Sequence, residues 1–311
     1  MLRRDRLDLP AIAVLTLLCA LWGVQQVTVK LGVQHGLPPL LQAALRSAGA
    51  AVLCALWISG RGGLRAALGG RAAGRDGLLI AVLFAAEFMA IYPGVRLTSA
   101  SRAVVFLYTA PFFTALGAHL LVPAERLRPA QGVGLAIAFA GVAAAFAEGL
   151  RAGHGSVMGD ALCALGGALW ASTILMIRIS PGLRRVTPAG LLLYQLAGSA
   201  PLILASSWLF GELAGPVHAD ALAWACLLYQ TAIVAFASYL AWFWLLQSYP
   251  AMRLSSFTFL TPLFGIVAGA LLLGEAVSPG LVVGLAAICA GLRLINRPVP
   301  APAKRAIVHR T

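Results

Sequence analysis

Residues 11–31 read AIAVLTLLCALWGVQQVTVKL, and no charged side chain interrupts this stretch before Lys30. About 20 apolar residues is the length that an α-helix needs to cross roughly 30 Å of hydrocarbon. Similar runs recur along the chain, which is 60% hydrophobic and only 11% charged, with a mean hydropathy of +0.89. A water-soluble domain of this length needs far more surface charge. The sequence therefore predicts an all-α integral membrane protein.

The first run follows Arg3, Arg4 and Arg6, as the apolar part of a signal peptide would. It has no clean small-residue cleavage site, and it continues far enough to span a bilayer. We interpret it as a retained transmembrane helix. Ten spans are predicted, at residues 10–31, 37–59, 77–96, 101–122, 129–148, 157–177, 187–209, 220–246, 252–274 and 279–296. The gaps between them are short and rich in Gly and Pro, so none can hold a soluble domain.

Basic residues test this count, because basic loops stay cytoplasmic. If the segments alternate from residues 1–9 as a cytoplasmic N-terminus, the outer segments hold only Lys30, Arg96, Arg102 and Arg151. Nearly all other basic residues fall on the inner side, which also holds the tail 297–311, expected to be disordered. This placement explains the net charge of +13 without nucleic acid, for which no motif is present. Both termini are expected in the cytoplasm, and the high Ala, Gly and Arg content suggests a bacterial inner membrane.

The sequence also repeats itself. With a shift of 150 residues, Glu125 aligns with Glu275, Gly134 with Gly284, and Gly141 with Gly291. With a shift of 148, Trp22 and Lys30 align with Trp170 and Arg178. Five spans per repeat is an odd number, so the second repeat must be inverted relative to the first. Two inverted halves can open a central site alternately to each side of the membrane, as carriers do.

Motifs in both halves resemble the EamA-like branch of the drug/metabolite transporter superfamily. They include Leu21-Trp22-Gly23, Leu45-Arg46, Thr98-Ser99-Ala100-Ser101, Gly159-Asp160 and Tyr249-Pro250-Ala251. The resemblance covers about residues 10–296, with one five-helix repeat at 10–148 and the other at 157–296. It implies ten helices in two inverted repeats around a central cavity, and export or uptake of small metabolites. Amino acids, amines, sugars and drugs are all substrates of such proteins. Glu87 departs from the pattern, since many relatives carry a neutral residue there.

Two ionisable residues lie deep inside predicted spans. Glu87 is about ten residues into the third span, and Arg46 is about nine residues into the second. Charge within a bilayer is costly, which makes both residues functional candidates. We expect them to line the cavity, either paired or facing substrate, and Glu87 is the candidate for proton coupling. A static ion pair that fixes helix packing is the alternative.

Aromatic rings and amides within the spans complete the predicted substrate site, because such walls suit a small organic ligand. These cavity candidates are Trp22, Gln25, Gln26, Tyr108, Trp170, Tyr194, Gln195, Tyr239 and Trp242. Interface anchoring and helix–helix hydrogen bonds are the alternatives for single members. Pro111 and Pro262 occupy equivalent spans and are expected to kink them mid-helix, as gate hinges or as fixed curvature. Lys30 and Arg178 are expected to reach the headgroups, and Glu125 and Glu275 to cap helices or contact gates.

These features predict a secondary transporter, with export the expected direction, for a small metabolite, amino-acid-like compound or drug. A channel or lipid flippase is the alternative, and an intramembrane enzyme is less favoured because no catalytic motif appears. The five cysteines are scattered inside apolar runs without metal-ligand spacing, so neither a metal nor another cofactor is expected. The expected partners are the lipid bilayer and the substrate, with a monomer the simpler state and a dimer the alternative.

Overall fold

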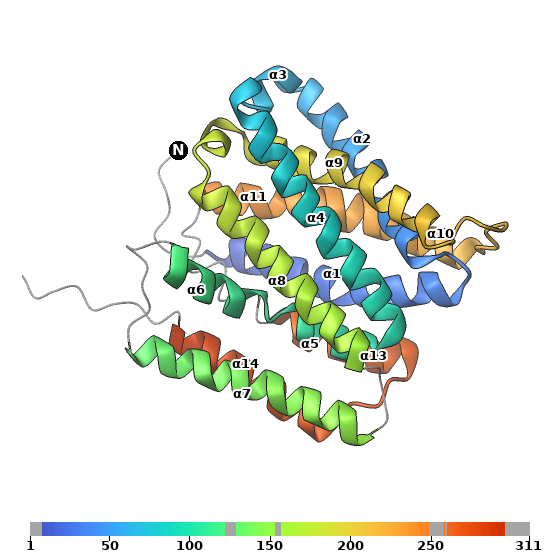
Figure 1. The fold of residues 1–311 in the computed structure, drawn as a ribbon, viewed down its shortest axis with the longest axis vertical. Coiled ribbons are helices and arrows are strands. Elements are labelled where there is room, and N and C mark those ends of the chain that lie inside the picture. Colours follow the sequence, from blue (N-terminus) through green and yellow to red (C-terminus); the bar gives the residue numbers. More distant parts are fainter. Residues whose placement is uncertain (1–7, 122–128, 153–156, 249–257, 259, 296–311) are drawn as a thin grey trace, which may run out of the picture.

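The computed structural model describes residues 8–121, 129–152, 157–248, 258 and 260–295. Within these ranges the regular secondary structure is helical throughout (Figure 1). Glu125, the Tyr249-Pro250-Ala251 motif and the tail 297–311 lie outside the described residues, so the expectations attached to them stay predictions.

The helices follow one another without a strand in the described part of the chain. In the first half they are α1 (Leu9–Gln34), α2 (Pro39–Ser59), α3 (Leu64–Ala67), α4 (Arg71–Leu97), α5 (Ala100–Leu107), α6 (Ala110–Leu121) and α7 (Pro129–Ala152). In the second half they are α8 (Val157–Ile179), the 3₁₀ helix η2 (Gly182–Arg185), α9 (Pro188–Leu209), α10 (Ala221–Leu228), the π-helix η3 (Tyr229–Ser238), α11 (Tyr239–Ser248), α13 (Leu260–Leu273) and α14 (Pro279–Ile295).

Most of the helices lie within the predicted spans. Seven are long and apolar enough to cross a membrane among the described residues: Leu9–Gln34, Pro39–Ser59, Ala73–Leu97, Ala100–Leu121, Val157–Ile179, Pro188–Leu209 and Ala221–Trp242. Three shorter apolar helices, Gln131–Gly141, Leu260–Leu273 and Pro279–Gly291, fall where the remaining spans were predicted. The prediction of an all-helical, multi-pass membrane protein is confirmed, while the full set of ten spans stays a prediction.

Helix starts follow ordinary capping chemistry. The Asp8 carboxylate accepts a hydrogen bond from the Ala11 amide at 3.1 Å, and Pro10 occupies the first turn of α1. Thr187 Oγ1 accepts from the Gly190 amide at 3.1 Å, with Pro188 opening α9. Both patterns satisfy amides that have no partner within their own helix.

The glycine-rich gap at 60–76 is not wholly a loop, as the sequence analysis had it. Gly62, Gly63, Gly69 and Gly70 adopt positive φ and turn the chain. Leu64–Ala67 between the two glycine pairs forms α3, and α4 already begins at Arg71. The Leu, Arg and Ala residues here are good helix formers, and between Leu64 and Ala67 and from Arg71 onward their helix propensity outweighs the turn preference of the glycines.

Two predicted spans are interrupted rather than uniform. Tyr108 and Thr109 separate α5 from α6, and Thr109 Oγ1 donates to the Phe106 carbonyl at 2.6 Å within this break. The predicted span 220–246 contains α10, η3 and α11 in succession, with the backbone wound more widely over the π-helix.

The two sequence halves interleave. α4 packs on α8 and α9, α2 packs on α9 and η3, and α1 packs on α13. α7 and α14 lie side by side as a separate pair at one edge of the bundle (Figure 1). Glycines allow the closest approaches, as between small residues in other membrane bundles. A Cβ added at Gly23 of α1 would lie 2.7 Å from the Gly265 nitrogen of α13.

Candidate functional site

Arg46 of α2 is fully buried, with none of its side chain exposed. Its guanidinium lies over the ring of Phe88 of α4, with Cζ 4.4 Å from the ring centroid. None of its three nitrogens has a hydrogen-bond partner. Tyr239 lies beside the guanidinium without the geometry of a hydrogen bond. A buried guanidinium with unused donors is rare, because the desolvation of its charge is left uncompensated.

Glu87 of α4 is also buried, and its Oε2 atom has no hydrogen-bond partner. Arg46 is near enough to attract it electrostatically, but not near enough for an ion pair. The structure therefore brings the two predicted residues into one region without joining them directly. We call Arg46, Glu87, Phe88, Tyr92 and Tyr239 the Arg46 centre.

A chain of buried hydrogen bonds crosses between the halves beside this centre. The Tyr92 hydroxyl donates to Gln230 Oε1 at 2.7 Å, and Gln230 Nε2 donates to Gln42 Oε1 at 2.9 Å. Gln42 Nε2 then donates to the Val29 carbonyl at 3.5 Å. These groups are satisfied by one another, so they fix α1, α2, α4 and η3 around the unsatisfied Arg46.

The π-helix η3 sets the register of this region. It carries Gln230 and Ser238, and Tyr239 follows it directly. Wide turns of this kind are uncommon and often mark functional sites. The sequence does not predict η3, since no residue pattern distinguishes it from an ordinary apolar helix.

An aromatic cluster adjoins Tyr239. Trp22 makes edge-on contacts with Tyr239 and Trp242, at centroid distances of 6.2 and 5.5 Å. Its Nε1 atom donates to Ser238 Oγ at 2.8 Å. The repeat-related Trp170 contacts Tyr108 edge-on at 5.7 Å, which is not the equivalent partner. Trp22 and Trp170 thus both make edge-on aromatic contacts, but their partner residues do not correspond to each other in the repeat.

Of the remaining predicted cavity residues, three glutamines are buried, and one tyrosine contacts residues near the start of α4. Gln25, Gln26 and Gln195 are buried, and Gln26 Oε1 has no hydrogen-bond partner. Tyr194 does not join the Arg46 centre. Its hydroxyl donates to the Leu68 carbonyl at 3.1 Å, and its ring packs against Gly77 near the start of α4.

Each of the two prolines lies in the first turn of a helical segment, and for Pro111 that segment is the second part of the span Ala100–Leu121. Pro111 is the second residue of α6, directly after the break at Tyr108 and Thr109, and Pro262 lies in the first turn of α13. Proline is tolerated in a first turn because those amides lack partners in any case. The span Ala100–Leu121 is interrupted directly before Pro111, in keeping with the expected disturbance of the helix there, and a hinge role for either proline stays a prediction. Two further prolines, Pro93 of α4 and Pro201 of α9, lie inside helices.

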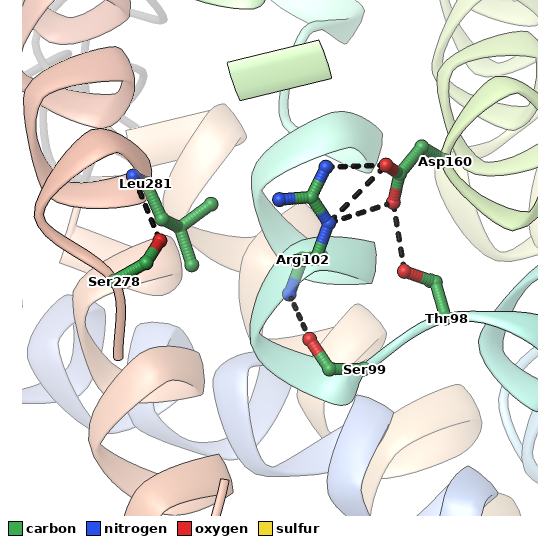
Figure 2. A network of polar contacts seen from close by, with 6 residues as sticks. All are labelled: Thr98, Ser99, Arg102, Asp160, Ser278 and Leu281. Atoms are coloured by element: carbon green, nitrogen blue, oxygen red, sulfur yellow. Dashed lines mark hydrogen bonds and ion pairs between the residues drawn. The ribbon is translucent and has the colours of Figure 1, made fainter. Parts of the chain in front are cut away.

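A second polar network joins the halves at the end of the bundle that holds residues 35–38, 98–99, 210–220 and 274–278, which we call the 35–38 end. Figure 2 shows the Arg102 side chain of α5 facing the Asp160 carboxylate of α8. Asp160 has no exposed surface, and its Oδ1 also accepts from the Thr98 hydroxyl at 2.7 Å. The sequence does not predict that Asp160 and Arg102 form a pair, since they lie 58 positions apart.

Two glutamates cap helices of the opposite half at the same end. Glu275 accepts from the Ala100 and Ser101 amides at 2.7 and 2.9 Å, at the start of α5. Glu212 accepts from the Leu40 and Leu41 amides at 3.1 and 2.9 Å, at the start of α2. A carboxylate at a helix N-terminus satisfies free amides and interacts well with the helix dipole.

Lys30 and Asp220 complete the 35–38 end. Lys30 does not reach toward headgroups as expected, because its ammonium donates to the Thr98 carbonyl. The Asp220 carboxylate lies 2.6 Å from His35 Nδ1 and caps α10 through the Leu222 and Ala223 amides. The hydrogen bond with His35 holds the pKa of Asp220 below its usual range.

These features define a class: a multi-pass α-helical membrane protein with charged and aromatic groups buried between two related halves. The model of the EamA-like transporter family matches the chain twice, at residues 9–147 and 157–297. The chain belongs to this family and is a membrane transporter.

Curated relatives agree with this assignment. A "Probable amino-acid metabolite efflux pump" of Salmonella typhimurium is 30% identical over 284 residues, covering 89% of this chain and 91% of the relative. A protein of the same name from Escherichia coli is 29% identical, with the same coverage. An uncharacterized Bacillus subtilis transporter is 35% identical, but over 53% of this chain. A solved crystal structure shares the fold, with a TM-score of 0.62, 20% identity and coverage of 91% of this chain and 96% of that one.

Proposed function

We propose that this chain is a secondary transporter that exports a small metabolite across the bacterial inner membrane by alternating access. Ten helices in two inverted halves, with both termini in the cytoplasm, would surround a substrate site at the Arg46 centre. A single chain would suffice, because its two halves supply the symmetry.

Reciprocal helix packing carries this proposal. If the halves are related by a two-fold axis, each contact between helices must recur with the partners exchanged. The α1 contact with α13 matches that of α8 with α6, and the contact of α1 with α10 matches that of α8 with α4. Likewise α2 packs on η3 as α9 packs on α4. This exchange is what an inverted repeat requires, and alternating access depends on such a repeat.

Glycines on α7 and α14 support the same symmetry at the level of single residues. A Cβ at Gly141 would lie 2.7 Å from the Gly284 carbonyl, and one at Gly291 would lie 2.3 Å from the Gly134 carbonyl. The repeat aligns Gly134 with Gly284 and Gly141 with Gly291, so each contact maps onto the other. Residue numbers rise along one helix as they fall along the other, so the equivalent helices run in opposite directions.

The substrate we favour is an amino-acid-like compound, since two relatives carry the name amino-acid metabolite efflux pump. The aromatic side chains of Trp22, Tyr239 and Trp242 beside the Arg46 centre suit the organic part of such a molecule. Tyr108, Trp170, Gln25, Gln26 and Gln195 remain candidates for its further walls.

During alternating access, the contacts between the halves would break first at one end of the helix bundle and then at the other. At the 35–38 end these are Arg102 with Asp160 and the Glu275 and Glu212 caps. At the opposite end Ser180 donates to Asp76, and the Thr187 amide donates to the Ala67 carbonyl at 3.0 Å. The helix break before Pro111 provides a place for α5 and α6 to move separately.

Glu87 is the proposed proton-coupling residue. Its Oε2 atom is buried without a partner, so a proton bound there would remove an uncompensated charge. Glu87→Gln should abolish the acceleration of transport by a pH gradient while exchange of substrate continues. A pH-gradient response equal to that of the natural protein would contradict this role.

Counterflow in proteoliposomes tests the transporter proposal. Vesicles holding excess unlabelled amino acid should transiently concentrate the labelled compound from outside, since a carrier exchanges one molecule for another. A channel would give equilibration without this transient, a flippase would move labelled lipid instead, and an enzyme would release a chemically altered product. Any of these three outcomes would overturn the proposal.

A further inference from the structure

Arg46 has the features of a binding group rather than a structural one. A structural arginine in a protein interior normally uses its donors, as Arg102 does against Asp160. Arg46 is at least as deeply buried, yet all three of its nitrogens lack partners. The Phe88 ring beneath the guanidinium supplies cation–π attraction, which is weaker than the cost of burying the charge without an acceptor.

Neighbouring groups do not complete the site. The Tyr92 hydroxyl is committed to Gln230. Tyr239 lies close to the guanidinium, but none of the three guanidinium nitrogens forms a hydrogen bond of normal geometry. Glu87 attracts Arg46 without contacting it and keeps its own unpartnered oxygen. The planar fork of N–H groups therefore has no acceptor within the described residues.

The missing acceptor must be an anion of limited charge. A guanidinium binds carboxylate and phosphate through two parallel hydrogen bonds. The Glu87 carboxyl in the same region would repel a doubly charged phosphate more strongly than a singly charged carboxylate. Tyr92, Tyr239 and Phe88 supply rings for an organic body attached to that carboxylate.

We infer that Arg46 binds the carboxylate group of the substrate, so that the transported compounds are organic monocarboxylates. This rests on the proposed function, which it deepens by assigning one chemical group of the substrate to one residue. Bound substrate would satisfy the guanidinium and offset its desolvation, so Arg46 would favour the loaded state over the empty one.

Ligand binding to the purified protein tests the inference separately from transport. The probes are L-leucine, L-phenylalanine, L-serine and L-threonine, each compared with its own primary amide, which lacks the carboxylate. Stabilisation against thermal unfolding is measured as a function of probe concentration. At least one free acid should bind, and its amide should bind at least about tenfold more weakly.

Three variants distinguish recognition of the carboxylate by the Arg46 guanidinium from effects of charge and of folding. Arg46→Lys keeps the charge but loses the fork, and should weaken binding of the acid about tenfold with little effect on the amide. Arg46→Met combined with Glu87→Gln removes both charges and should abolish the preference for the acid while the protein stays monodisperse. Arg61→Lys is the matched control, since Arg61 also stacks on a ring, that of Trp57, but at an exposed position.

Equal binding of acid and amide by the natural protein would overturn the inference. So would the absence of binding by all four acids, or an acid preference that survives in the double variant. Acid-selective binding without counterflow would instead contradict the proposed function and leave the Arg46 assignment intact. Binding of phosphate-headgroup lipid in place of the acids would also refute it.

Discussion

At the scale of the residue, two buried arginines show opposite relations to their surroundings. Arg102 is neutralised by Asp160, which also accepts from Thr98. Arg46 lies over the Phe88 ring with Glu87 and Tyr239 nearby, and none of its three nitrogens has a hydrogen-bond partner. The sequence does not distinguish the two, since both are arginines near or within apolar runs. The tertiary contacts separate a structural arginine from one that is available to a ligand.

The Arg102–Asp160 pair predicts a large loss of stability when one partner is removed. Asp160→Asn should lower the free energy of unfolding by about 3–5 kcal/mol, because the buried guanidinium then lacks its counter-charge. Arg102→Met combined with Asp160→Leu should recover part of this loss, since no charge remains buried. Unfolding in detergent measures both.

His35→Ala is the control for this prediction, because His35 contacts Asp220 where both side chains are exposed. Its effect should be much smaller, as for surface ion pairs in general. Losses of equal size at the buried and exposed pairs would contradict the role assigned to Arg102 and Asp160.

At the scale of the element, apolar runs predicted where helices lie but not how they are interrupted. The predicted starts at 129, 157 and 279 coincide with those of α7, α8 and α14. Pro111 indicated a disturbance in its span but not that α5 and α6 would be separate helices, and no residue pattern indicated the π-helix η3. Hydrophobicity determines that a segment enters the membrane, whereas packing against neighbouring helices determines its local winding.

The glycine contacts between α7 and α14 give a prediction at this scale. Gly291→Ala would place a Cβ 2.3 Å from the Gly134 carbonyl, and Gly141→Ala one 2.7 Å from the Gly284 carbonyl. Each should destabilise the protein by about 1–3 kcal/mol, because backbone on the opposite helix must move. Thermal unfolding of the purified variants measures the cost.

Gly132→Ala is the matched control on α7, where an added Cβ would meet nothing within 4 Å. Alanine is the better helix former, so this change should be neutral or slightly stabilising. If all three substitutions behaved alike, α7 and α14 would not be in the close contact described.

At the scale of the whole molecule, helices of one sequence half pack against helices of the other, and equivalent helices make equivalent contacts with the partners exchanged. The halves do not pack as two separate bodies, because α4 lies against α8 and α9, and α1 against α13. Each half therefore depends on the other for its buried surface. Polar groups such as Gln42 and Gln230 meet only through this interleaving.

The proposed inverted arrangement predicts opposite exposure of two equivalent connections. In a variant with its five natural cysteines replaced, Arg61→Cys should react with a membrane-impermeant maleimide only from the cytoplasmic side. Val217→Cys should react only from the outside. Basic residues around Arg61, and their absence around Val217, give the physical reason. Labelling of both positions from the same side would show that the number or direction of spans is wrong.

The sequence by itself determined that the chain is a multi-pass helical membrane protein, where its helices lie, and which family it resembles. Runs of apolar residues and the placement of arginines suffice for this, because the bilayer acts on each segment separately. Only the tertiary structure decided that Asp160 neutralises Arg102, that Glu275 and Glu212 cap helices of the other half, and that Arg46 keeps its donors free. Those facts depend on distances between residues far apart in the chain, which hydrophobicity does not encode.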